Sequence, residues 1–193
     1  GYHSVLCRRS DQQGLNTLVA DIQAQGGDAS GCLLNVVNEG VIEKLVATVE
    51  QDIGPIEVVI FNLGAQIGDR GLQDTSYKAF ERCWHIATFS LFRTASVVCP
   101  LMVERGKGSI IVTSATAAVR GNAGQHAHAA AMGARRMLCQ SLNAELGPKG
   151  LHIAHVLVDG AVDAPDTLGK MLGEEQFKAL RETRGMENDG LIL

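Results

Sequence analysis

The sequence lacks any excess of positive charge. Its 193 residues include 17 Lys and Arg against 21 Asp and Glu, a formal net charge of −4, and no basic stripe is visible. Because nucleic acids and anionic membranes attract basic surfaces, we expect neither as a partner. The apolar runs are too short to cross a bilayer, and the first residues do not have the pattern of a signal peptide. We therefore expect a cytoplasmic protein.

The sequence is also poor in patterns that bind metal or form disulfides. Its five cysteines are odd in number and never spaced C-x-x-C; they are Cys7, Cys32, Cys83, Cys99 and Cys139. We interpret them as buried, reduced thiols of an intracellular protein. His126 and His128 lie two apart in a predicted helix and face away from each other. His152 and His155 lie on opposite faces of a predicted strand. No metal site is expected.

What the sequence does contain is a repeated alternation of short apolar runs and amphipathic segments. Hydrophobic residues make up 46% of the chain and charged residues 20%, which fits one globular domain over residues 1–193. The predicted strands are 2–7, 29–34, 56–61, 109–114 and 151–158. Repeated β-then-α units predict a parallel sheet with helices on both faces. The expected fold class is a doubly wound, Rossmann-type α/β domain.

Polar capping residues mark the starts of the predicted helices. The expected caps are Ser10 (in a capping box with Gln13), Asn38, and one of Asp74, Thr75 or Ser76. The third helix is the longest and runs to about residue 104, after a loop at 66–73. The fourth helix is expected at about 125–146 and the last at about 174–181.

The stretch 108–165 carries the most specific pattern in the chain. A predicted strand, a small polar loop, a helix and a second strand form a βαβ crossover, whose first loop lies at the carboxyl edge of the sheet. Within it, residues 143–153 read N-A-E-L-G-P-K-G-L-H-I and residues 159–163 read D-G-A-V-D. This block resembles the last crossover of the short-chain dehydrogenases/reductases, in particular a divergent branch of that family. The resemblance implies a Rossmann-type oxidoreductase that uses a nicotinamide dinucleotide.

The resemblance also implies a glycine-rich turn, after an opening central strand, that binds the cofactor pyrophosphate through backbone N–H groups. Neither the turn nor that strand occurs in this sequence, which starts with Gly1 almost inside a predicted strand. We expect the natural protein to be longer at this end, and the chain as given to bind NADP(H) weakly or not at all. Without the central strand, its two neighbours in the sheet expose unpaired backbone groups. The sequence also stops before the strand that ends the family's sheet.

Several positions match the family's cofactor contacts. Arg8 and Arg9 stand where an arginine accommodates the 2′-phosphate, which implies NADP; alternatively, both are solvated surface residues. The family's threonine that holds the nicotinamide carboxamide falls at Ala164. The remaining positions are Asn35 and Val36 against the adenine, Asn62 and Gly64 in an N-L-G turn after the third predicted strand, and Asp159 and Gly160 after the last one. For the asparagine of that turn, the alternative role is to pin neighbouring strands.

The family's chemistry depends on Asn, Ser, Tyr and Lys, and this sequence differs at all four positions, which fall at Ala87, Ala115, His128 and Met132. In the family, Tyr is the general acid, Lys makes it more acidic and holds the ribose, Ser orients the carbonyl, and Asn supports a water relay. His128 can act as an acid near neutral pH, or can be a helix residue without a role. Ser114 can replace the serine only if its strand has ended or bulged, because adjacent strand residues point to opposite faces.

Two hypotheses follow from these positions. The first is an NADP-linked oxidoreductase of unknown substrate, in which His128 and Ser114 take over the chemistry. The second is a non-catalytic protein that keeps the fold as a binding or oligomerisation module. The residues favour the second, so we expect little or no carbonyl-reductase activity. In the family, two helices corresponding to 76–104 and 126–146 join the subunits, which implies a homodimer or homotetramer; alternatively, both helices simply pack on the sheet.

Overall fold

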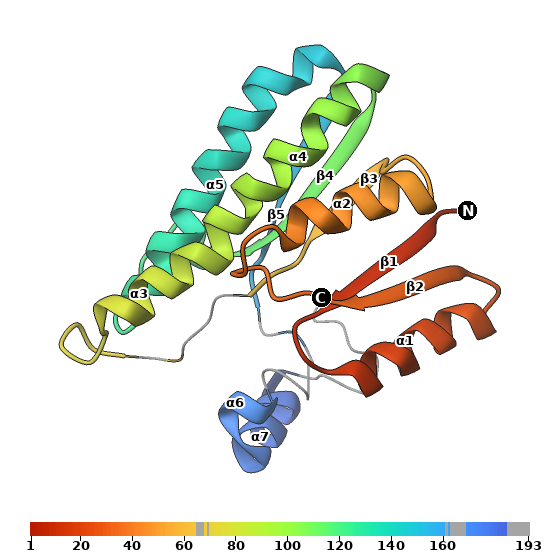
Figure 1. Ribbon diagram of the computed structural model, residues 1–193. Coiled ribbons are helices and arrows are strands. Elements are labelled where there is room, and N and C mark those ends of the chain that lie inside the picture. Colours follow the sequence, from red (N-terminus) through yellow and green to blue (C-terminus); the bar gives the residue numbers. More distant parts are fainter. Residues whose placement is uncertain (65–67, 69, 161, 163–168, 185–193) are drawn as a thin grey trace.

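The computed structural model describes residues 1–64, 68, 70–160, 162 and 169–184, and these form strands and helices in alternation (Figure 1). Ala164 and part of the loop predicted at 66–73 lie outside the described residues. The strands are β1 (His3–Arg8), β2 (Asp28–Leu33), β3 (Val58–Phe61), β4 (Gly108–Ala115) and β5 (Leu151–Val158). The helices are α1 (Gln12–Ala24), α2 (Val41–Asp52), α3 (Tyr77–Trp84), α4 (Ser90–Arg105), α5 (His126–Leu146), α6 (Lys170–Leu172) and α7 (Glu174–Arg184).

All strand pairings are parallel, as the sequence predicts, but the strands form two sheets instead of one. In one sheet β1 pairs with β2, and in the other the order is β3-β4-β5. Within the described residues no strand joins β1 to β3, so the expected gap in the sheet falls between them. The predicted α/β architecture is therefore confirmed.

The backbone of Ile56, the first residue predicted for the third strand, hydrogen-bonds to the two side chains of an ion pair. The Ile56 N–H donates to Glu50 Oε1 (2.9 Å), and the Ile56 carbonyl accepts from Arg105 Nη2 (3.0 Å). Arg105 and Glu50 also form a bidentate pair, with N–O distances of 2.9 and 3.0 Å. Since side chains occupy the Ile56 backbone groups, β3 begins at Val58 instead of residue 56.

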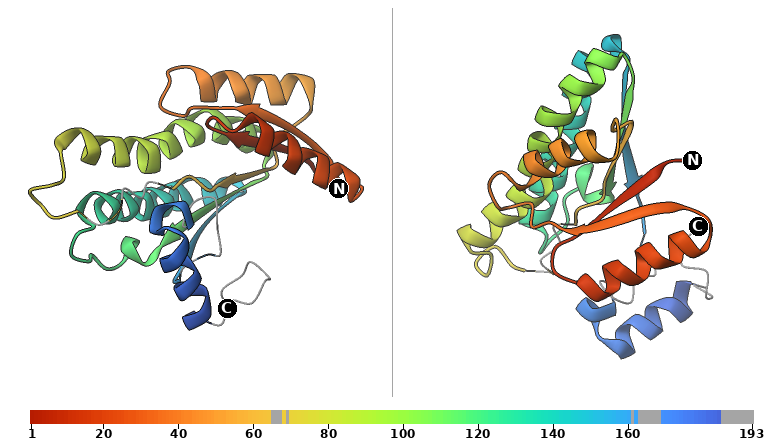
Figure 2. Two further views of the ribbon diagram at one scale, coloured as in Figure 1. Left: turned by 90° about the horizontal axis from the view of Figure 1, so that it is seen from below. Right: turned by 45° about the vertical axis from the view of Figure 1, so that its right-hand side comes forward.

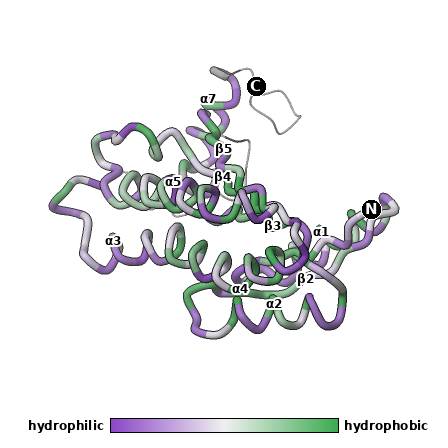
Figure 3. The backbone as a smooth tube through the Cα atoms, turned by 90° about the horizontal axis from the view of Figure 1, so that it is seen from above, coloured by the Kyte–Doolittle hydropathy of each residue, from purple (hydrophilic) through white to green (hydrophobic). Residues whose placement is uncertain are grey.

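The main hydrophobic core lies between the β3-β4-β5 sheet and the helices α2, α4 and α5. Alternate residues of β4, including Ile110 and Val112, are fully buried there, together with Leu91 and Met102 of α4. Figure 3 shows hydrophobic and hydrophilic residues alternating along these helices, the pattern of helices that are buried on one side. This core fixes α4 and α5 against the strands whose carboxyl ends carry the candidate site.

The helix caps differ from the sequence prediction at two of three positions. Ser76 caps α3 as predicted, because its Oγ accepts from the Ala79 N–H (3.2 Å). For α1 the cap is Asp11, not Ser10, and its carboxylate accepts from the Gly14 N–H (2.9 Å).

The second predicted cap, Asn38, is replaced by Gly40 at the start of α2. Gly40 adopts a left-handed conformation with φ of 73°, which a glycine tolerates without steric cost. The backbone carbonyl of Asn38 instead accepts from Arg93 of α4 (3.1 Å). A tertiary contact thus takes the place of the local cap.

The helix from Tyr77 to Arg105, referred to below as the long helix, is continuous through α3, a π-helical turn at His85–Phe89, and α4. By length and composition, it is the one helix within the described part of the chain that meets the requirements of a membrane span. The expectation that no apolar segment is long enough is therefore wrong. The most apolar window of this helix is 44% buried inside the fold, and Figures 1 and 2 show the helix running beside α5 over the sheet.

The last described helices lie apart from the main core. Figures 1 and 2 show α6 and α7 next to α1, on the side away from α4. Phe177 of α7 is buried and lies against Gly169. The helix predicted at 174–181 is confirmed and extends to Arg184.

Candidate functional site

The candidate site lies at the carboxyl ends of β3, β4 and β5, where parallel strands bring their following loops together. Thr113 Oγ1 of β4 donates to Asn62 Oδ1 after β3 (2.5 Å). On the other side, Thr116 Oγ1 hydrogen-bonds Asp159 Oδ1 after β5 (2.5 Å). Two of the predicted cofactor positions, Asn62 and Asp159, therefore bind the β4 segment. This supports the structural alternative for Asn62, in which it links neighbouring strands.

Ser114 faces the helices, contrary to the expectation that its hydroxyl would turn away. Ser114 shares the buried face of β4 with Ile110 and Val112, and its Oγ lies 3.6 Å from Met132 Sδ on α5. Ala115, which stands at the family's serine position, packs beside Met132 in a small cluster of alanines. The strand continues to Ala115 without a bulge, so ordinary alternation of side chains places Ser114 toward α5.

His128 and Met132 lie one helical turn apart on the buried face of α5. The exposed fraction is 9% for His128 and 2% for Met132. The prediction that His126 and His128 face apart is confirmed, because His126 is exposed. The Met132 sulfur is a weak acceptor and carries neither a charge nor a donor. The site thus keeps the helical spacing of the family's Tyr and Lys without the cation.

Arg135, which sequence reasoning missed, is the charged residue at the centre of the site. It is 2% exposed and donates to three carbonyls: Nε to Ala87 (2.9 Å), Nη1 to Thr113 (2.8 Å) and Nη2 to Leu63 (2.7 Å). The guanidinium also lies 5.1 Å from the ring centroid of Phe61. Burial lowers the pKa of Arg135 to about 10, so it remains charged at neutral pH. One side chain thereby joins the long helix, β4 and the loop after β3.

The sequence pattern of α5 already indicates that Arg135 is buried and hydrogen-bonded. Arg135 follows His128 and Met132 at helical spacing of seven and three residues, so it lies on the same buried stripe of α5. A charged residue on a buried stripe requires compensating hydrogen bonds. What the sequence does not contain is the identity of the three carbonyls, which come from distant segments.

The π-helical turn supplies one of these carbonyls. Ala87, at the family's Asn position, is fully buried and lies in this turn. A π-turn changes the helical hydrogen-bond pattern locally, and such turns are frequent at functional sites. Here the Ala87 carbonyl accepts from Arg135, while Thr88 Oγ1 donates to the Ala131 carbonyl (2.8 Å). The long helix and α5 are therefore fastened together at this point.

The positions predicted to contact the adenosine half of the cofactor lie at the end of the other sheet. Arg8 is half-buried and forms an ion pair with Asp11, whereas Arg9 is exposed. The pKa of Asp11 is lowered, mainly by the Gly14 N–H that it accepts and further by Arg8. Asn35 Nδ2 lies 3.4 Å from Asn38 Oδ1.

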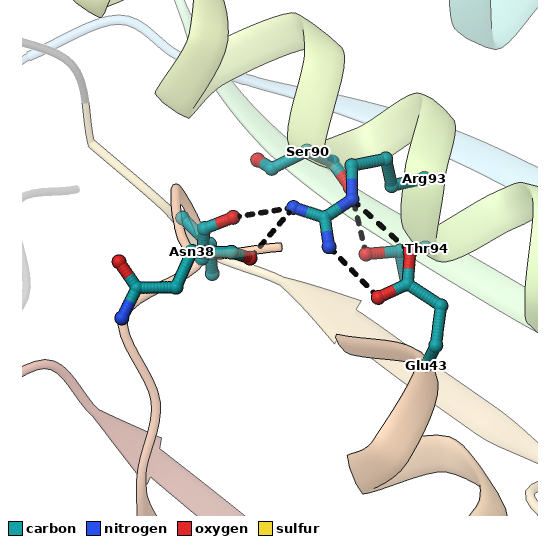
Figure 4. Close-up of polar contacts among 6 residues, drawn as sticks. Asn38, Glu43, Ser90, Arg93 and Thr94 are labelled. Carbon is teal, nitrogen blue, oxygen red and sulfur yellow. Dashed lines mark hydrogen bonds and ion pairs between the residues drawn. The ribbon is translucent and has the colours of Figure 1, made fainter. Parts of the chain in front are cut away.

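Val36, the other predicted adenine contact, is held by Arg93 of α4. Arg93 Nη1 donates to the Val36 carbonyl (2.8 Å), and Nε and Nη2 bind both carboxylate oxygens of Glu43 (3.1 and 2.7 Å). Figure 4 shows the guanidinium pointing toward Glu43 and the backbone of Asn38. Beside this network lies an open cavity of about 390 Å³, lined in part by His85 and Phe89.

The two glycines among the predicted cofactor positions are exposed. A Cβ on Gly64 would meet no atom of the described chain within 4 Å, so the packing alone does not require glycine there. Gly160 directly follows β5 and Asp159. Across the described residues, no group of three His, Cys, Asp or Glu side chains is placed to hold a metal ion.

The comparison with known proteins decides the family. The pattern of the short chain dehydrogenase family matches residues 1–169. This protein belongs to the short-chain dehydrogenase family. The chain is 24% identical over 197 residues to 7alpha-hydroxysteroid dehydrogenase of Escherichia coli (strain K12), covering 98% of this chain and 76% of that protein. It is 31% identical over 173 residues to the short-chain reductase protein NovJ of Streptomyces niveus, covering 89% of this chain and 65% of that one.

Solved short-chain dehydrogenases confirm the Rossmann-type fold. A short-chain dehydrogenase from Rhodopseudomonas palustris superposes with a TM-score of 0.77 at 27% identity, covering 100% of this chain and 84% of that one. One from Sphingobium yanoikuyae, in complex with NADPH, gives 0.75 at 24% identity, with 83% and 62% covered. A 7 alpha-hydroxysteroid dehydrogenase complexed with NADH gives 0.73 at 24% identity, with 78% and 58% covered. These structural neighbours therefore include one that binds NADPH and one that binds NADH, which lacks the 2′-phosphate.

The nicotinamide half of such a cofactor does not fit the residues of this short-chain dehydrogenase. At the ribose position stands the thioether of Met132, in contact with Ser114. The nearby cation, Arg135, is buried and directs its donors to backbone carbonyls. On the adenosine side Arg9 is exposed, whereas Arg8 is half-buried and already paired with Asp11.

Proposed function

We propose that this protein is a short-chain dehydrogenase homologue, nominally NADP-dependent, with little or no carbonyl-reductase activity. The observation that carries the proposal is the contact between Ser114 Oγ and Met132 Sδ. The family holds the ribose with a lysine at the position of Met132. Here the hydroxyl of Ser114, which lies next to the family's serine position, hydrogen-bonds the neutral sulfur of Met132. Neither group is left to polarise a carbonyl or to hold a sugar.

The energetic argument concerns the proton. Reduction of a carbonyl leaves an alkoxide, and a positioned acid typically accelerates its protonation about a hundred- to ten-thousand-fold. Donors preorganised around the developing charge are often the largest further contribution. His128 can donate a proton, but the residue one turn later is Met132, which supplies no charge to tune it. Arg135 is no substitute, because its three nitrogens all donate to carbonyls.

For the cofactor we propose NADP in preference to NAD. Arg8 and Arg9 support it, since a guanidinium pairs well with a 2′-phosphate. The proposed contacts in the rest of the site are Asn35, Val36, Asn62, Gly64, Asp159 and Gly160. Binding depends on contacts to the pyrophosphate as well, and we propose that this chain alone binds NADP(H) weakly.

The second candidate function is a non-catalytic module that self-associates in the cytoplasm. It is supported by apolar side chains that remain exposed on the long helix and α5, namely Phe80, Trp84, Phe92 and Met137. Between the two helices lies an apolar hollow of about 320 Å³, lined by Trp84, Thr88, Phe89, Phe92 and Leu138. A homodimer or homotetramer through these helices would cover this surface.

The proposal is tested by measuring NADPH oxidation with a broad panel of aldehydes and ketones. We expect no turnover above background for the protein or for His128→Ala. The matched gain-of-function variant is His128→Tyr combined with Met132→Lys. Because a buried lysine is expected to destabilise the fold, its assay counts only where circular dichroism shows a folded protein. Turnover by the unmodified protein that disappears in His128→Ala would show that His128 has replaced the tyrosine, and would overturn the proposal. Turnover that appears only in the double variant would support it.

A further inference from the structure

The two cysteines of the β1-β2 sheet face each other directly. Cys7 of β1 and Cys32 of β2 are register partners, and their sulfur atoms lie 3.6 Å apart. Two residues back on each strand are Val5 and Ser30, so the cysteines share the face that also carries Ser30. The other face is covered by α1, whose Leu15 lies against Gly31. The pair is therefore on the face that α1 leaves open.

The pair differs from the remaining cysteines in its exposure. Cys83, Cys99 and Cys139 are buried, as the sequence predicts, but Cys7 is exposed and Cys32 is half-buried. The expectation that all five thiols are buried is therefore wrong for these two. Parallel strands bring them together although they are 25 residues apart in the sequence, and small molecules in solution can reach them.

The backbone is compatible with a bond between the two sulfurs. Neighbouring strands lie about 4.7–4.9 Å apart, within the roughly 4.4–6.8 Å between the Cα atoms of a disulfide. The sulfurs must close from 3.6 Å to about 2.05 Å. Cys7 is exposed and Cys32 is half-buried, so reductants in solution can also reach the bond, and exposed disulfides are among the readily reduced ones.

We propose that Cys7 and Cys32 form a reversible intramolecular disulfide with small disulfide oxidants of the oxidised-glutathione class. The Cys32 thiolate attacks the oxidant, forms a mixed disulfide and releases one small thiol. The Cys7 thiol then loses its proton to water, attacks the Cys32 sulfur and releases the second small thiol. Overall, two protein thiols are oxidised to one disulfide, and one small disulfide is reduced to two thiols.

The order of the two steps follows from the environment of Cys7. Partial burial of its sulfur away from water, then the negative charge of a Cys32 thiolate and the hydrogen bond between the two sulfurs, raise the pKa of Cys7 to about 12. Cys7 therefore keeps its proton while Cys32 is free. Once Cys32 is in the mixed disulfide, its charge no longer opposes ionisation of Cys7, but the burial of the Cys7 sulfur still does. Cys7 is therefore the resolving thiol, and we expect its attack to be the slower of the two steps. The proposal does not depend on cofactor binding or on catalysis.

The test equilibrates the folded protein in glutathione buffers of increasing oxidised fraction, followed by acid quenching, alkylation and mass analysis of the intact protein and its peptides. We expect two thiols to disappear together, without bound glutathione, and the peptides that contain Cys7 and Cys32 to be cross-linked. Added dithiothreitol should restore both thiols. The matched control, Cys7→Ser with Cys32→Ser, should lose none, and Cys7→Ser alone should stop at a glutathione adduct on Cys32.

Other outcomes would overturn the inference. These are persistent glutathione adducts in the unmodified protein, disulfides between two chains on a non-reducing gel, or two free thiols at the most oxidising ratio. Circular dichroism of each sample confirms that the thiols were tested in the folded chain.

Discussion

Arg135 Nε donates to the carbonyl of Ala87 across 2.9 Å, which ties α5 to the π-helical turn of the long helix. In the family pattern, the residue at the Ala87 position supports a water relay. Here a guanidinium binds the backbone carbonyl directly. A structural hydrogen bond thus stands where the family conducts protons, and this supports a role of Arg135 in stability over one in turnover.

The first prediction concerns that network. Arg135→Met removes the donor from three carbonyls, one in a buried and two in part-buried hydrogen bonds, and each unpaired group costs about 1 kcal/mol or more, so we expect the free energy of unfolding to fall by about 3 kcal/mol. Arg135→Lys should recover part of the loss, since an ammonium cannot reproduce the planar fork. Urea denaturation followed by circular dichroism measures both. Arg136→Met is the neighbouring control and should change the free energy by less than about 1 kcal/mol; equal losses at both positions would contradict the prediction.

The second prediction concerns Met132, which is 2% exposed. Met132→Lys places an ammonium in a site that already holds the buried Arg135 cation. The described residues show no carboxylate there that could pair with it. An uncompensated buried charge costs about 3–5 kcal/mol, so this variant should unfold at markedly lower urea. Met132→Leu, a volume-conserving control, should cost less than about 1.5 kcal/mol. A lysine variant as stable as the leucine variant would mean that the site retains a carboxylate or solvent for the cation.

Local patterns were enough to predict the strands and most helices. The apolar runs around Ile60, Ile111 and Ile153 are short and alternate with amphipathic helices. This pattern predicts buried parallel strands, and the structure has strands there. Where the prediction failed, a distant residue had taken over a local role. Arg105 and Glu50 occupy the backbone of Ile56.

The candidate site could be predicted only in part. Family resemblance located His128 and Met132, because their spacing on α5 is encoded in consecutive residues. It could not reveal that Arg135 reaches Leu63, which lies 72 residues away. The same holds for the contact between Cys7 and Cys32, which depends on the register of two strands and on no local motif. Contacts of this kind follow from tertiary packing.

The third prediction is a pH dependence due to His155 of β5. Burial, and then the positive charges of Arg136 and Arg135, lower the pKa of His155 below its ordinary value of 6.5. The folded protein therefore binds fewer protons on this group than the unfolded chain does, and stability rises with pH across that interval. The contribution is complete above pH 6.5 and is lost as the pH falls through the folded pKa.

The measurement is the free energy of unfolding between about pH 5 and pH 8, the range in which histidines titrate. His155→Gln should flatten the part of the curve below pH 6.5, whereas the exposed control His152→Gln should leave it unchanged. A slope that persists in His155→Gln would assign the pH dependence to another group.

The last prediction is that the protein self-associates through the long helix and α5. Phe92, 51% exposed, borders the apolar hollow between these helices, and a second copy would remove its ring from water. Phe92→Glu would bury a carboxylate in that interface, and we expect dissociation to monomers in sedimentation velocity at micromolar concentration. Val119 is equally exposed, at 51%, but lies outside both helices, so Val119→Glu should sediment like the unmodified protein. An unmodified protein that sediments as a monomer, or an assembly that survives Phe92→Glu, would show that this surface does not join two copies.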